Sequence, residues 1–148
     1  MNRTNRAGFS LIEILLVIVI IGVLAAMVVP NFSGQGEKAR RAAAVTDIEV
    51  NLATALDLYE LDNGRYPTTD QGLSALLTEP SSAPAPKSWN GPYLKKKKIP
   101  KDPWGQPYVY AGPGTHNTDD YDLSSLGQDG VESDDDIANW ENARTTEK

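Results

Sequence analysis

Apolar and polar positions divide the chain into one unbroken apolar stretch and a longer amphipathic remainder. From Phe9 to Val29 only Ser10 and Glu13 are polar. A helix of this length, at about 1.5 Å per residue, is about as long as the hydrocarbon core of a bilayer is thick. The pattern therefore predicts a helix that can span a membrane.

Glu13 lies inside this apolar stretch, where a charge is costly and needs a partner. Cleavage between Gly8 and Phe9 would create an α-amino group four residues away, and the two opposite charges could neutralise each other. A secretory signal peptide is the alternative, because Arg3 and Arg6 precede the apolar stretch. The length of the stretch, its buried carboxylate and the lack of a small-x-small site after it favour the first interpretation.

The helical pattern resumes after a Ser-Gly-Gln-Gly segment at 33–36. Apolar residues then recur at spacings of three and four, with charges between them, at Val45, Ile48, Leu52, Ala55 and Tyr59. This spacing predicts a helix with one face packed on a domain and the other in solvent. Asn63-Gly64 predicts its end. We expect one long helix from about Phe9 to Asp62, with a kink or a melted turn near Pro30.

Shorter elements follow the helix. Thr68 and Gln71 match a capping box, which predicts a short helix through Leu73, Leu76 and Leu77. Four prolines between 78 and 92 predict a loop. Tyr108 to Tyr110 and Tyr121 to Ser125 predict short strands in a β-meander. The fold class is therefore α+β.

Composition limits the class of protein. A chain of 148 residues holds one anchor and one small globular domain. Its net charge is −6, and it becomes −8 without residues 1–8, which contain two arginines and no acid. This charge disfavours nucleic-acid binding. The absence of cysteine excludes a disulfide framework and a thiolate metal site.

Candidate catalytic residues are few. His116 is the only histidine, and its Gly-Pro-Gly-Thr-His-Asn context predicts an exposed loop with no nucleophile elbow nearby. Trp89, Trp104 and Trp140 could form a sugar platform, but packing in turns and in the core is the preferred interpretation. We expect no enzyme, and a glycosidase-like use of the acidic C-terminal segment is a remote alternative.

Several separated motifs carry a resemblance to a known family. The short basic leader, Gly8, Phe9 and Glu13 at the fifth position of a matured chain resemble the signature of type IV pilins and pseudopilins. RYPTTDQGL at 65–73, KDPWGQPYVY at 101–110 and the segment from Asp136 to Trp140 resemble the major pseudopilins of type II secretion systems. Typical type IV major pilins carry two cysteines, which this chain lacks. A type IV pilus or competence pilin subunit is the alternative.

The resemblance implies a fold and an organisation. The pilin-like fold is a long N-terminal α-helix, transmembrane in one half and amphipathic in the other, packed on a small antiparallel β-sheet with an ordered C-terminal loop. Residues 1–8 would be a leader peptide, 9–31 a transmembrane and filament-core helix, and 32–148 a periplasmic head. The chain would be a single-pass protein of the bacterial inner membrane, with its C-terminal domain in the periplasm.

The resemblance also implies a function and partners. A prepilin peptidase would cut between Gly8 and Phe9 and methylate the amine of Phe9, and Glu13 would guide docking onto the terminal amine of a preceding subunit. The chain would be the major structural subunit of a helical homopolymer, the pseudopilus, which drives export of folded proteins across the outer membrane. Minor pseudopilins and an inner-membrane assembly platform would be further partners.

Lys95 to Lys98 form an uninterrupted basic run. A solvated turn, or an edge strand protected by charge, is the preferred interpretation. The functional alternative is contact with an acidic face of the next subunit. Asp57 on the long helix is a candidate partner, because similar pseudopilins carry an acid there.

The segment from Asp119 to Asp136 contains eight acidic residues among eighteen. Such density favours a solvated flexible tail, yet a strand pattern precedes its densest part and Ile137 and Trp140 follow it as core residues. A hard cation such as calcium would offset the repulsion, although the spacing is not that of an EF-hand.

The family resemblance implies specific calcium ligands in this segment. They are the carbonyl of Leu126, the side chain of Asp129, the carbonyl of Val131 and the carboxylates of Asp135 and Asp136. The segment between Val131 and Asp135 differs by about one residue from relatives, so Ser133 and Asp134 receive no role. A membrane-anchored, calcium-dependent binding module is a remote alternative for the whole chain.

Overall fold

A computed structural model describes residues 9–28, 33–133 and 136–140. The chain forms two compact units, one ending at Lys38 and one beginning at Ala39. In the first unit, α1 covers Leu11–Val28. The large apolar side chains described in α1 are exposed, from 46% for Val17 to 86% for Leu11. Pro30, where we predicted a kink or a melted turn, lies outside the described residues.

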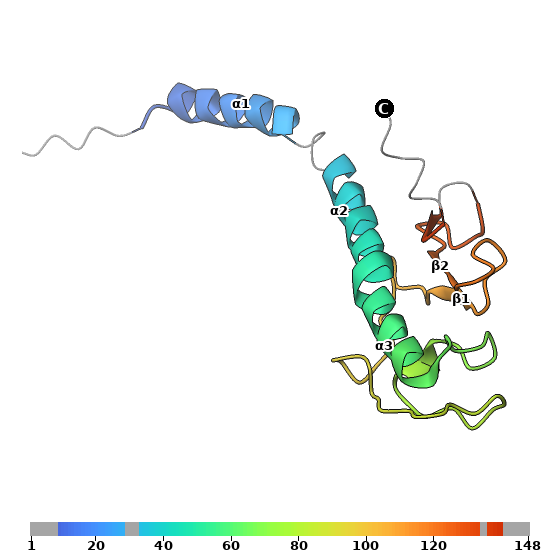
Figure 1. Ribbon diagram of the computed structural model, residues 1–148. Coiled ribbons are helices and arrows are strands. Elements are labelled where there is room, and N and C mark those ends of the chain that lie inside the picture. Colours follow the sequence, from blue (N-terminus) through green and yellow to red (C-terminus); the bar gives the residue numbers. More distant parts are fainter. Residues whose placement is uncertain (1–8, 29–32, 134–135, 141–148) are drawn as a thin grey trace, which may run out of the picture. The chain divides into compact units, whose positions relative to one another are not determined.

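The second helical run has three consecutive parts (Figure 1): α2 (Ser33–Thr46), the π-helix η2 (Asp47–Leu52) and α3 (Ala53–Asn63). Gly64 ends it in the left-handed conformation, with φ of 73°, and its backbone N–H donates to the Glu60 carbonyl at 2.6 Å. The predicted helix end is therefore confirmed. Four of the five predicted core positions are buried, whereas Val45 is half-buried and Ala44 takes the buried place beside it.

The π-helix was not predicted, and the spacing of the buried residues explains it. Ala44, Ile48 and Leu52 follow one another at two successive steps of four. In an α-helix four residues advance by about 400°, so each step drifts about 40° around the axis. The wider π-turn, in which hydrogen bonds join residues five apart, limits this drift. It thereby keeps these residues on the same face as Leu56 and Tyr59.

The predicted capping box forms after the helix. The Gln71 backbone N–H donates to Thr68 Oγ1 at 3.3 Å, and the Thr68 N–H donates to Gln71 Oε1 at 3.1 Å. The helix that follows is only a single 3-10 turn, η3 (Leu73–Leu76). It contributes Leu73, Ala75 and Leu76 to the core.

A small antiparallel sheet packs beside the helix, in the order β1-β2-β3 (Figure 1). Its strands are β1 (Val109–Ala111), β2 (Asp122–Ser125) and β3 (Ile137–Ala138). Tyr110 pairs with Leu123, and Ser125 pairs with Ile137. The first two strands confirm the predicted meander to within one residue at each end, and β3 was expected only as a core segment.

The core of the second unit lies between the helix and the sheet. Its aliphatic members include Ile48, Leu52, Leu56, Leu76 and Leu123, all with no exposed surface. Tyr121 contacts Tyr66 edge-on at 4.9 Å between ring centroids and stacks on Tyr110 at 5.9 Å. Trp89 and Trp104 pack against this core, as predicted. The predicted α+β class is confirmed.

Candidate functional site

The N-terminal motif is described from Phe9 onward, and Gly8 lies outside the described residues. Phe9 and Ser10 precede α1, and Glu13 is in its first turn. The backbone N–H groups of Glu13 and Ile14 donate to the Ser10 carbonyl at 3.0 and 3.3 Å. A carboxylate at this end interacts favourably with the helix dipole. The described helices include none that is both long and apolar enough to cross a membrane.

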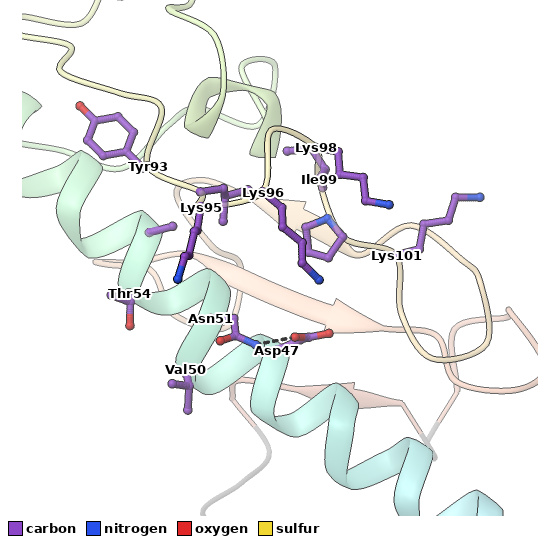
Figure 2. A pocket seen from close by; sticks show the side chains of 13 residues that line it. Asp47, Val50, Asn51, Thr54, Tyr93, Lys95, Lys96, Lys98, Ile99 and Lys101 are labelled. Carbon is purple, nitrogen blue, oxygen red and sulfur yellow. Dashed lines mark hydrogen bonds between the residues drawn. The ribbon is translucent and has the colours of Figure 1, made fainter.

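The basic run forms one wall of a groove, which we call the lysine groove. Lys95 to Lys98 lie in an irregular loop and are exposed, so they form the predicted turn and not a strand. A cavity of about 890 Å³ separates this loop from the helix (Figure 2). Lys95 and Lys96 extend toward the helix, whereas Lys98 and Lys101 extend away from it. Over the described ranges, no ion pair joins these lysines to a carboxylate.

The helical wall of this groove comes mainly from η2. Asp47, Val50 and Asn51 line it, followed by Thr54 and Ala55 of α3. Asp47 accepts hydrogen bonds from Asn51 Nδ2 at 2.7 Å and from the Tyr108 hydroxyl at 2.9 Å. Burial, and then the bond to Asp47, raise the pKa of Tyr108. The Asp47 carboxylate is thus engaged within its own subunit, and the groove presents mainly lysine charge.

Asp57 belongs to an acidic patch that the sequence did not reveal. It is exposed on α3 and accepts a hydrogen bond from the Tyr66 hydroxyl at 3.2 Å. Burial raises the pKa of Tyr66, and the nearby charges of Asp120, Glu60 and Asp57 raise it further. All three carboxylates are exposed. Asp120 is about sixty residues from the helix in sequence, so only the fold brings it to this patch.

The C-terminal loop brings together some of the predicted calcium ligands. Leu126 and Asp136 line one cavity of about 280 Å³ together with Glu132. Asp129 is exposed and does not line this cavity, and its Oδ1 accepts the backbone N–H of Val131 at 3.2 Å. Asp135 lies outside the described residues. Among those that are described, no cluster of three histidine or acidic side chains could hold a metal ion.

The donors in this loop nevertheless suit a hard cation. The residues that line the cavity beside the loop include the acids Asp122, Glu132 and Asp136 together with Leu126, and calcium prefers carboxylate and carbonyl oxygens. Gly127 and Gly130 adopt positive φ angles of 66° and 68°, which fold the loop back on itself. Ser133 accepts the Asp136 N–H through its carbonyl at 3.2 Å. Asp134 lies outside the described residues.

Asp102 forms a hydrogen bond at the start of this loop, a role that the sequence did not indicate. Its carboxylate is buried and accepts the Ser125 hydroxyl at 2.6 Å, next to Leu126. It also accepts the backbone N–H groups of Trp104 and Gln106 at 3.1 and 2.7 Å. The Asp-Pro-Trp-Gly turn is therefore tied to the start of the acidic loop. An Asp-Pro pair by itself is typical only of a turn.

Asp122 holds the loop that contains Thr115 and His116, which also line the cavity of about 280 Å³. Burial acts to raise its pKa, but hydrogen bonds from the backbone N–H groups of His116, Asn117 and Thr115 and from the Thr115 hydroxyl outweigh burial and lower the pKa to about 2. His116 is half-exposed, as predicted, and stacks on Trp140 at 4.2 Å between ring centroids. The stack fixes the last described residue of the chain against this loop.

Comparisons with known proteins agree with this arrangement. Residues 3–29 match the family model of the prokaryotic N-terminal methylation motif. With the pilin-like head, this motif places the chain in the class of pilin-like subunits. Residues 31–140 match the family model "Type II secretion system (T2SS), protein G". The chain belongs to this protein G family.

Individual relatives support the same assignment. The chain is 50% identical to type II secretion system core protein G of Aeromonas hydrophila over 142 residues, which are 95% of this chain and 96% of the relative. It is 53% identical to the Klebsiella pneumoniae protein over 138 residues, 92% and 95% of the two chains.

A solved structure is similar as well. The crystal structure of the major pseudopilin from the type 2 secretion system of enterohaemorrhagic Escherichia coli matches with a TM-score of 0.65 and 43% identity. The match covers 76% of this chain and 96% of that one. The prediction of a type II secretion pseudopilin, in preference to a type IV pilin, is confirmed.

Proposed function

We propose that this chain is the major structural subunit of a type II secretion pseudopilus. It is stored in the inner membrane by its N-terminal helix and polymerises into a periplasmic filament that drives export of folded proteins. The observation that carries the proposal is α1, whose apolar side chains find no cover in the described part of the chain and whose first turn holds one carboxylate. Such a helix needs lipid or equivalent helices around it.

Glu13 provides the test of polymerisation. In the filament its carboxylate pairs with the terminal amine of Phe9 in a neighbouring subunit, because an unpaired charge in an apolar core is costly. Glu13→Ala should leave membrane insertion intact but block filament assembly and secretion, while Glu13→Asp retains the charge as a control. Filaments are measured in the fraction sheared from cells and by negative-stain microscopy. Normal secretion by Glu13→Ala would refute the docking role.

Processing and location follow from the same proposal. A prepilin peptidase cuts between Gly8 and Phe9 and methylates the new amine, and the C-terminal head then lies in the periplasm. With a bulky residue in place of Gly8, the protein should remain at the size of the precursor on a gel. A substitution at Asn5 should still give the shorter, processed protein. Mature-length protein from the Gly8 variant would show that the cleavage site is wrong.

We infer that the lysine groove of one subunit contacts Asp57 of the next. Exposed lysines on one surface and exposed carboxylates on another favour a head-to-tail contact. Lys96→Glu or Asp57→Lys alone should reduce assembly, and the two together should restore it. Because the chain contains no cysteine, the double variant Lys96→Cys and Asp57→Cys should form crosslinked dimers in filaments, whereas neither single variant should. If the charge-swapped double variant instead loses as much assembly as the two single variants added together, the proposed contact is wrong.

Calcium is proposed as the ligand of the C-terminal loop. Leu126 and Val131 would offer carbonyl oxygens, and Asp129, Asp135 and Asp136 would offer carboxylates. A cation there would offset the repulsion of five acids between Asp129 and Asp136 and add its binding energy to folding. Calcium should raise the melting temperature, and Asp129→Ala or Asp135→Ala should abolish the rise, whereas Asp119→Ala should not. Equal melting temperatures in calcium and chelator would exclude the site.

The remaining partners are the minor pseudopilins and the inner-membrane assembly platform, which a polymerising subunit requires at its ends. We infer no catalytic role. His116 is bonded to Asp122 and stacked on Trp140, an arrangement that accounts for it as a structural residue.

A further inference from the structure

The π-helix η2 supplies most of the helical wall of the lysine groove, and it separates the two α-helical parts of the run from Ser33 to Asn63. Three of the five helix residues that line the groove, Asp47, Val50 and Asn51, belong to η2. Figure 2 shows Asn51 and Asp47 facing the gap into which Lys95 and Lys96 extend. Single π-turns inside α-helices are rare, and those that do occur are frequently found at functional sites.

A π-turn contains about one residue more than an α-helical turn. The core of the head does not require this extra residue. If one residue between Ile48 and Leu52 were removed, the steps between buried positions would become four, three, four and three. That is the ordinary pattern of an amphipathic α-helix, and it keeps every buried residue on one face. Val50, a residue within the π-turn, is 55% exposed. Its removal would therefore take no side chain from the core.

The wider turn instead shapes the surface. It includes an exposed apolar side chain, Val50, next to Asn51 in the lining of the groove. The Asp47 carboxylate is held by Tyr108 and Asn51, so it competes little for the lysine charge. The groove therefore has one wall of lysines and one helical wall that combines the apolar Val50 with the polar Asp47 and Asn51.

We propose that the lysine groove binds the acidic patch of a second copy of the chain, and that the π-turn determines the specificity of this contact. The acidic patch consists of Asp57, Glu60 and Asp120. The inference rests on the proposed lysine contact and adds the helical wall to it. Charge complementarity supports the choice of partner, because these three exposed carboxylates gather around Tyr66. The groove and the patch share no residue, which permits a heterologous contact that repeats from subunit to subunit in an open filament.

The test uses the full chain, expressed in secreting cells in place of the native gene. Deletion of Val50 should leave the purified protein folded in detergent, with a melting temperature close to that of the wild type. It should lower the amount of sheared filament by about tenfold, the equivalent of about 1.4 kcal/mol per contact. Val50→Ala keeps the chain length and the π-turn and truncates only the side chain, so it should lose less filament than the deletion does.

A second variant keeps the proposal testable if the deletion unfolds the head. Val50→Asp retains the π-turn and puts a negative charge in the groove, where it should repel the incoming carboxylates and lower filament yield. Wild-type filament yield from this variant, or from a folded deletion variant, would overturn the role of η2. Unfolding of the deletion variant would contradict the claim that the core does not need the extra residue.

The same experiment separates this inference from the one it rests on. If Lys96→Glu loses filaments while deletion of Val50 and Val50→Asp do not, the lysine contact stands and the role of the π-turn is wrong. If Lys96→Glu also assembles normally, the lysine contact itself is wrong.

Discussion

Asp122 offers the sharpest test of how the head is held together. Its Oδ2 accepts hydrogen bonds from the Thr115 N–H at 2.7 Å, the His116 N–H at 2.9 Å and the Thr115 hydroxyl at 3.0 Å, and lies 3.1 Å from His116 Nδ1. Its Oδ1 accepts the Asn117 N–H at 2.9 Å. In Asp122→Asn one of these oxygens becomes an NH₂ group that faces N–H donors.

The expected loss can be worked from the pKa. Hydrogen bonds lower the pKa of Asp122 from 3.8 to about 2 in the folded state, and each unit is worth about 1.4 kcal/mol. The carboxylate therefore contributes about 2 kcal/mol, which is fully present above about pH 4 and is lost as the pH falls through about 2. An N–H left without an acceptor adds about 1 kcal/mol or more. We expect Asp122→Asn to lose about 3 kcal/mol at pH 5.

The assay is urea unfolding of a soluble fragment beginning at Ser33, for wild type and variant, at several pH values from 5 to 2. The difference in free energy of unfolding should shrink toward about 1 kcal/mol at the acid end, because the wild-type carboxylate becomes protonated there. Asp119→Asn, at an exposed position nearby, should show no such change. A difference that is small at pH 5, or that does not vary with pH, would refute the reasoning.

Four further substitutions test the packing of the head in the same fragment. Tyr59→Phe should be neutral or stabilising by up to about 1 kcal/mol, because the Tyr59 hydroxyl is buried with no hydrogen-bond partner among the described residues, whereas Tyr108→Phe loses a bond to Asp47 and should cost about 1 kcal/mol. Gly112→Ala should cost roughly 1–3 kcal/mol or more, because a Cβ there would overlap the Pro67 carbonyl oxygen and the Tyr110 hydroxyl; a stable variant would contradict the tight packing. Asp102→Ala should cost about 3 kcal/mol, since the buried Ser125 hydroxyl and the backbone N–H groups of Trp104 and Gln106 lose this acceptor, and unchanged urea midpoints would show that this support is dispensable.

The arrangement of the lysine groove has a consequence for assembly. Surface ion pairs are individually weak and screened by salt. Filaments held partly by lysine and carboxylate contacts should therefore dissociate more readily at high ionic strength, while contacts between apolar α1 helices persist.

Local patterns along the chain were enough to predict the helical run that ends at Gly64, the capping box and two of the three strands. These features depend on neighbours in sequence: spacings of three and four, a glycine that accepts positive φ, and a side chain that reaches a backbone N–H three residues away. The N-terminal motif is local in the same sense. Gly8, Phe9 and Glu13 lie within six residues, so their relation to a cleavage product could be inferred from the sequence.

Tertiary structure alone decided the rest. The π-turn arises because the core of the head fixes Ala44, Ile48 and Leu52 on one face, and a pattern search accepts spacings of four without registering their accumulated drift. The acidic patch and the Asp102 support join residues that are far apart in sequence. Sequence determined which residues could form helices, turns and strands, and packing determined which of their polar side chains meet, because that depends on distances between elements that no local pattern contains.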